Sequence, residues 1–182
     1  MSKMIFINLP VTDLGRSVAF YEAIGGRKQP KFSNEQAAMI VLSDTIHVML
    51  LTHDFYRTFT GKPIADAHNS SQVLLALSAE STGEVDATVD KAGAAGGKAD
   101  PGPKQEMVEL MYGRSFEDPD GHHWEVMWMD AGAAEQGATA FEEAPVGVSS
   151  VAAPIFAGTA EGARCVGSII AVGPSARMTT AR

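Results

Sequence analysis

A pattern that occurs twice in the sequence is the feature that most constrains the fold. Apolar residues recur at spacings of four, three and three in two segments, at Leu14, Val18, Tyr21 and Ile24, and again at Val85, Val89, Ala92 and Ala95. This spacing places the apolar residues of each segment on one face of a helix. A pair of glycines follows each segment. The sequence therefore predicts two amphipathic helices that end in left-handed glycine caps.

Apolar runs typical of strands surround both helices in the same order. One run precedes each helix and two runs follow it: Met4–Leu9, Ala37–Leu42 and Ile46–Thr52 in the first half, and Gln72–Ser78, Leu110–Glu117 and His122–Met129 in the second. A weaker strand is expected between helix and hairpin in each half, at Gln29–Phe32 and Lys98–Gln105. The pattern predicts an α+β fold built from two β-α-β-β-β modules that pair their sheets.

The same pattern divides the chain. We expect one domain over residues 1–130, with module one at 1–53, a linker at 54–71 and module two at 72–130. The remaining residues, 131–182, are rich in alanine and glycine, a composition that buries little apolar surface against its ordering entropy. We expect a flexible tail there, with packing of Cys165–Val172 onto the domain or a partner as the alternative.

Composition excludes several classes of function. The net charge of −8 argues against a nucleic-acid or anionic-membrane partner, because phosphate binding needs clustered lysine and arginine. Cys165 is the only cysteine, so neither an intrachain disulfide nor a cysteine zinc cluster can form. No apolar run approaches the roughly 18 residues of a membrane span, and the first ten residues read as a strand rather than a signal peptide. We therefore expect a cytoplasmic protein.

Three stretches carry a family resemblance: Asn8–Leu14 running into Ser17–Glu22, Ala94–Gly97, and Ser115–Val126, which contains Asp-Pro-Asp-Gly and Trp-Glu. In this order they resemble the vicinal-oxygen-chelate superfamily of glyoxalases, bleomycin resistance proteins and extradiol dioxygenases. The resemblance covers about residues 1–130. It implies sheets that curl around a central cleft, usually completed in a homodimer, and a small-molecule ligand in that cleft.

In metal enzymes of that superfamily, each module offers one ligand from its first strand and one from its last. The resemblance places these positions at Phe6, Leu50, Leu74 and Glu125. Only Glu125 has an electron-donating side chain, although a shift in register from Leu74 to Gln72 would raise the number to two. The expectation is a protein without a metal, and the alternative is a site for Fe, Mn, Ni or Zn.

Alternation along the strands assigns the cleft a mainly apolar lining with a few polar groups, which is typical of small-molecule sites: Phe6, Asn8, Leu50, Leu74, His123, Glu125 and Met127. His123 and Glu125 are the candidate catalytic residues, as a carboxylate–imidazole pair; the alternative is a structural Glu125 beside a surface histidine. A closed core with Glu125 paired to Arg114 or Arg16 also remains open.

Tyr112 and Arg114 are further candidates. At the mouth of the cleft they would hold an anionic or carbonyl substrate through charge-assisted hydrogen bonds. The alternative is a strand with a bulge at Gly113.

Three functions are compatible with these residues. We expect a small-molecule binding protein that works without metal, similar to the drug-sequestering resistance proteins of the superfamily. The second hypothesis is an enzyme, either a metal-dependent glyoxalase-like lyase or an extradiol-type dioxygenase. The third is a structural or regulatory dimer whose cleft is fully packed.

Overall fold

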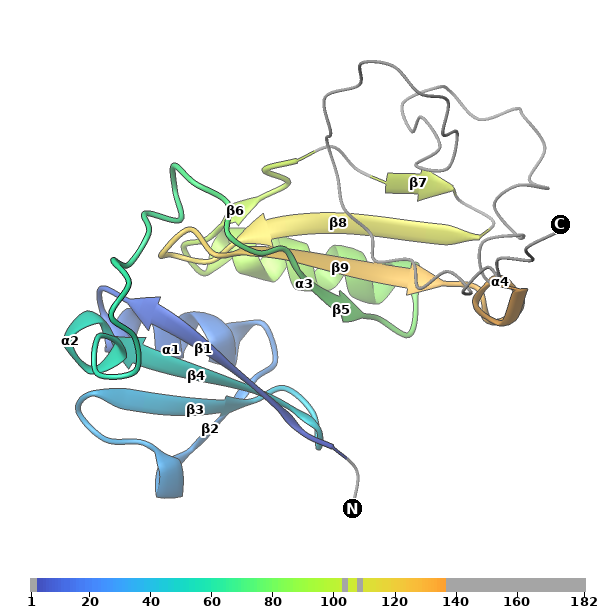
Figure 1. Ribbon diagram of the computed structural model, residues 1–182. Helices are drawn as coiled ribbons and strands as arrows, with labels where there is room; N and C mark the ends of the chain where they lie inside the picture. Colours follow the sequence, from blue (N-terminus) through green and yellow to red (C-terminus); the bar gives the residue numbers. More distant parts are fainter. Residues whose placement is uncertain (1–2, 103–104, 108–109, 137–182) are drawn as a thin grey trace, which may run out of the picture. The chain divides into compact units, whose positions relative to one another are not determined.

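The computed structural model describes residues 3–102, 105–107 and 110–136 (Figure 1). All of them belong to one compact unit, Met1–Ser149. No helix in the described part of the chain is long and apolar enough to cross a membrane.

Module one is a four-stranded sheet with one long helix. Its strands lie in the order β1-β4-β3-β2, with β1 parallel to β4 and the other neighbours antiparallel. Along the chain the elements are β1 (Ile5–Val11), α1 (Leu14–Ala23), β2 (Arg27–Gln29), the 3-10 turn η1 (Pro30–Phe32), β3 (Ala37–Val41) and β4 (Ile46–Thr52). The weak strand expected at Gln29–Phe32 is therefore earlier and shorter, because Pro30 begins a 3-10 turn.

Module two repeats this order. Its strands follow the order β5-β9-β8-β6, with β5 parallel to β9, and β7 also pairs with β8. The elements after the short helix α2 (His53–Tyr56) are β5 (Leu75–Ser78), α3 (Thr82–Ala94), β6 (Lys98–Ala99), β7 (Gln105–Met107), β8 (Met111–Glu117) and β9 (His123–Met129). The expected fold of two β-α-β-β-β modules is confirmed, with two short strands where one weak strand was predicted.

The segment expected as a tail begins with a helix, α4 (Ala131–Gln136). The Asp130 carboxylate accepts the backbone N–H of Gly132 and of Ala133 at its start. The remainder of that segment, 137–182, lies outside the described residues, and so does Cys165.

Both long helices end at the predicted glycines and begin at a polar capping side chain. The Asp13 carboxylate caps α1 through the Arg16 N–H, and the Ser81 hydroxyl caps α3 through the Glu84 N–H. Gly25 and Gly96 follow the helices with φ of 108° and 96°, a conformation that favours glycine. These two caps confirm the glycine stops read from the sequence.

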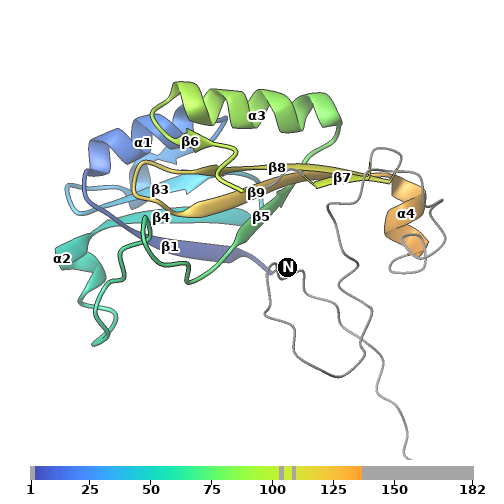
Figure 2. The same ribbon diagram turned by 90° about the horizontal axis from the view of Figure 1, so that it is seen from above.

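Each long helix covers one face of its own sheet, and the main core lies between the helices and the sheets (Figure 2). Fully buried side chains from both modules meet in it, among them Phe20 of α1, Leu50 of β4 and Trp124 of β9. Phe116 of β8 lies 5.9 Å from Phe20 and stacks on Trp124, as measured between ring centroids. The apolar faces of α1 and α3 therefore contribute to one continuous core.

A buried polar network joins the two modules. Asp118, in the turn between β8 and β9, is 2% exposed and accepts the Tyr21 hydroxyl of α1 at 2.8 Å. The Trp124 indole donates to the same hydroxyl at 3.0 Å. Burial raises the pKa of Tyr21 well above its usual value, so the phenol keeps its proton and remains the donor to Asp118 at neutral pH.

The same turn makes a second group of contacts with module one. The Asp120 carboxylate accepts the Thr12 N–H at 2.9 Å, the Ser17 hydroxyl at 2.8 Å and Arg16 Nη2 at 3.1 Å. Gly121 has a φ of 88°, and a Cβ there would lie 2.7 Å from the backbone nitrogen of His68 in the linker. The turn is thus held by α1 on one side and by the linker on the other.

Replacing Asp118 tests the contribution of this network. We expect Asp118→Ala to lower the free energy of unfolding by about 3 kcal/mol, because Tyr21 and the backbone N–H groups of Asp120 and His122 lose their acceptor. Urea unfolding followed by circular dichroism measures it. Asp44→Ala is the matched control, since Asp44 is exposed in the corresponding turn of module one. Equal losses in the two variants would contradict the role given to Asp118.

Candidate functional site

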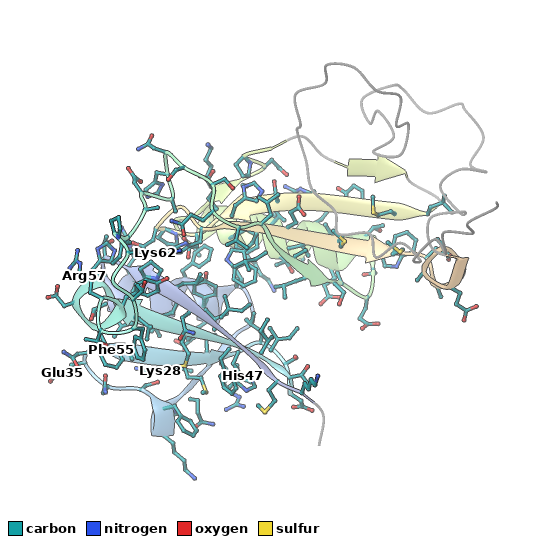
Figure 3. The ribbon with its side chains drawn as sticks, viewed as in Figure 1. Lys28, Glu35, His47, Phe55, Arg57 and Lys62 are labelled. Atoms are coloured by element: carbon teal, nitrogen blue, oxygen red, sulfur yellow. The ribbon has the colours of Figure 1, made fainter. Side chains whose placement is uncertain are left out.

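The face of the module-one sheet that points away from α1 carries aromatic, amide and thioether side chains. In the parallel register, Phe6 lies opposite His47 and Asn8 lies opposite Met49. The rings of Phe6 and His47 stack with their centroids 5.1 Å apart. His47, labelled in Figure 3, is 7% exposed, and its Nδ1 is buried with no hydrogen-bond partner among the described residues. Phe6 and His47 therefore form one aromatic surface on this face.

The corresponding face of module two carries His123, Glu125 and Met127. These side chains alternate along β9 with Trp124, Val126 and Trp128, which pack on the core. Glu125 lies beside Ala76 of β5 and Ser115 of β8. We call the two faces that point away from α1 and α3 the open face, and define it by these residues: Phe6, Asn8, His47, Met49, His123, Glu125 and Met127.

Glu125 and His123 are half-buried, and neither makes a side-chain hydrogen bond or ion pair within the described residues. Arg16 pairs with Asp120 instead of Glu125, and Arg114 pairs with three other carboxylates. The structure thus brings the two candidate catalytic residues to one face but joins them by no hydrogen bond.

Leu50 does not lie with Phe6. It is fully buried, pairs with Leu9 and packs in the core under α1. The expectation that Leu50 lines the cleft is therefore wrong, because the sequence does not fix which residues of β1 and β4 are paired. His47 and Met49 occupy the open face of this strand, and neither was predicted for the site. Alternation along β1 is the signal that could have indicated this face, because Ile7 and Leu9 face the core and the residues between them face away from it.

Leu74 comes directly before β5 and is 38% exposed. Leu75 pairs with Trp124 and packs against the core, so β5 begins one residue after Leu74. Gln72 lies outside the strand, which gives no support to the alternative register that would make it a ligand.

Tyr112 and Arg114 point to the helix side of the sheet rather than to the open face. The Tyr112 hydroxyl donates to Asp86 of α3 at 2.8 Å. Arg114 forms a two-pronged contact with Asp100, through Nε at 3.0 Å and Nη2 at 2.7 Å. Its Nη1 also contacts Asp86 and Asp90. The hydrogen bonds that Arg114 donates to Asp100 raise the pKa of its guanidinium, so Arg114 serves as a permanently charged link between β8 and α3.

A family comparison agrees with this geometry. The model of the Glyoxalase/Bleomycin resistance protein/Dioxygenase superfamily matches residues 3–126. The chain belongs to this superfamily. No curated protein matches the chain.

Solved structures of the superfamily share the fold. A hypothetical protein of S. aureus is 26% identical over 70% of this chain and 94% of its own, with a TM-score of 0.58. A glyoxalase-related enzyme from Fulvimarina pelagi is 22% identical, with coverage of 70% and 88% and a TM-score of 0.58. The fosfomycin resistance protein FosX from Mesorhizobium loti is 16% identical, with coverage of 74% and 98% and a TM-score of 0.54.

The residues at the superfamily's metal positions do not fit a divalent ion. Phe6 and Leu74 are apolar and partly exposed, and Leu50 is buried in the core. Glu125 keeps a carboxylate, but the described residues contain no group of three or more His, Cys, Asp or Glu side chains placed to hold a metal. Divalent ions need several N or O donors placed together, and the polar groups of the open face form no such group within the described residues.

Replacing Arg114 distinguishes a role in ligand binding from a role in the stability of the domain. We expect Arg114→Leu to lower the free energy of unfolding by about 2 kcal/mol, because it leaves three carboxylates close together without their shared cation. This value is below that of a fully buried pair because two of the carboxylates are largely exposed. Arg27→Leu, at an exposed position in β2, is the control in urea unfolding. Unchanged stability together with altered ligand binding would place Arg114 in the site instead.

Proposed function

We propose that this superfamily member binds a small, mainly apolar molecule against its open face, without the divalent metal of the superfamily's enzymes. The observation that carries the proposal is the composition of that face. Phe6, Met49 and Met127 supply apolar contact area, and Asn8, His47 and Glu125 supply a few polar groups among them. Apolar walls with a small number of polar groups are the usual lining of small-molecule sites.

A second copy of the chain completes the cleft in this proposal. β1 and β5 are edge strands, each paired on one side only within the described residues. Exposed large apolar side chains gather at their beginnings: Met4, Ile5, Phe6, Val73 and Leu74. An unpaired strand edge beside exposed apolar residues favours pairing with another chain, and the resulting homodimer would remove these side chains from water.

Glu125 and His123 support the alternative of a metal-dependent lyase or dioxygenase only in part. Both face the open side without a partner in the described structure, so both are available to a ligand. One carboxylate and one imidazole are fewer donors than such a metal centre uses. The same two groups suit hydrogen bonding to a polar substituent of a bound molecule.

Native mass spectrometry of purified, untagged protein tests metal content and assembly in one measurement. We expect a dimer mass that contains far less than one metal ion per chain, also after incubation with Fe²⁺, Mn²⁺, Ni²⁺ or Zn²⁺. The reason is the donor set, with Glu125 alone at the superfamily's metal positions. A stoichiometric metal that survives dialysis would favour the enzyme, and a monomer at every concentration would contradict the shared cleft.

Binding of the neutral apolar dye Nile red tests the open face itself. We expect Phe6→Glu to weaken dye binding about tenfold, because a charge then replaces apolar contact area in the site. Phe32→Glu is the matched control: Phe32 is also an exposed phenylalanine, 61% exposed, but lies in η1. Fluorescence titration measures both variants. Equal effects in both, or no dye binding by the wild type, would contradict the proposal.

A further inference from the structure

A cavity lies at the carboxyl ends of β1 and β4, where the linker passes the turn between β8 and β9. Its volume is about 360 Å³, and two arginines and three histidines line it: Arg16, Arg57, His53, His68 and His122. None of the residues that define the open face contributes to its wall. His47 of the open face and Arg57 lie toward opposite ends of β4, as Figure 3 shows. We call this cavity the linker pocket.

The two acidic residues in the wall are already occupied by donors. Asp120 accepts hydrogen bonds from Thr12, Ser17 and Arg16. Asp66 accepts the Asn69 amide at 2.6 Å and the His68 N–H at 3.0 Å, and the bond from Asn69 lowers the pKa of Asp66. Asp120 therefore holds Arg16 in place, and Asp66 holds the turn of the linker that forms part of the wall.

The basic residues, by contrast, keep free donors. Arg16 is held in place by Nη2, which donates to Thr12, Asp120 and the Pro119 carbonyl, so its Nε and Nη1 remain without partners in the described structure. Arg57 uses only Nη1, on Asp54 at 2.8 Å. The rings of His53 and His68 make no hydrogen bond within the described residues. Most of the polar groups of the pocket that lack a partner are therefore hydrogen-bond donors.

We infer that the linker pocket binds a small phosphate monoester, with the phosphate between Arg16 and Arg57. A guanidinium group from α1 and one from the linker match the charge and the oxygen geometry of a phosphate. The wall holds as many arginines as aspartates, whereas the chain as a whole has a net charge of −8. The volume exceeds that of a phosphate ion alone, and Ile64 and Ala67 give part of the wall an apolar surface for the organic group.

Isothermal titration calorimetry of the full chain with phenyl phosphate and with inorganic phosphate tests this inference. We expect both to bind, and phenyl phosphate to bind about tenfold more tightly because its ring contacts the apolar wall. Arg57→Gln is the main variant. It should weaken phenyl phosphate binding about tenfold without unfolding the chain, since Arg57 is exposed and pairs only with exposed Asp54.

Lys62→Gln is the matched control. Lys62 is an exposed cation of the same linker that does not line the pocket, so its loss should change binding by less than about twofold (Figure 3). Phe6→Glu should leave phosphate binding unchanged, which separates this inference from the open-face proposal. No heat with either probe would overturn the inference. So would equal weakening by Arg57→Gln and Lys62→Gln, which would indicate nonspecific attraction.

Discussion

The hydrogen bond between Tyr21 and the buried Asp118 carboxylate is the interaction on which the arrangement of the domain depends. A carboxylate with 2% exposure is costly unless donors surround it, and here they come from both modules and from its own turn. Around it, Asp120 contacts the start of α1, and Gly121 contacts the linker. One turn thus sets the position of module two against module one and shapes a wall of the linker pocket.

Much of the fold could be predicted because its signals are local. The helices follow from an apolar spacing with a cap at each end, and β4 was predicted at the residues where it forms, Ile46–Thr52. The predictions of the two weak strands were wrong for local reasons too. Pro30 ends β2 by starting a 3-10 turn, and the predicted strand after α3 divides into β6 and β7.

The site was harder to predict, because it depends on which residues pair across a sheet. Alternation along β4 separates two faces but does not say which of them shares a side with Phe6. The parallel pairing of Leu9 with Leu50 decides this, and it brings His47 rather than Leu50 to the open face. The role of Arg114 was hard to predict because it depends on a contact between β8 and α3. Asp86 and Asp90, one turn apart on α3, were a readable signal that a cation faces that helix.

The contact between Tyr21 of module one and Asp118 of module two has no counterpart in the opposite direction, although the two modules share one order of elements. Shifting the apolar spacing of α1 onto α3 places Ala92 at the position of Tyr21. In the first hairpin the residue after the strand, which bonds to the residue four positions on, is Leu42, where the second hairpin has Asp118. The equivalent contact from α3 to the first hairpin therefore has neither the phenol nor the buried carboxylate. A chain made of two first modules would lack the acceptor, and one made of two second modules would lack the phenol. The two modules share one order of elements but depend on each other through residues that are not interchangeable.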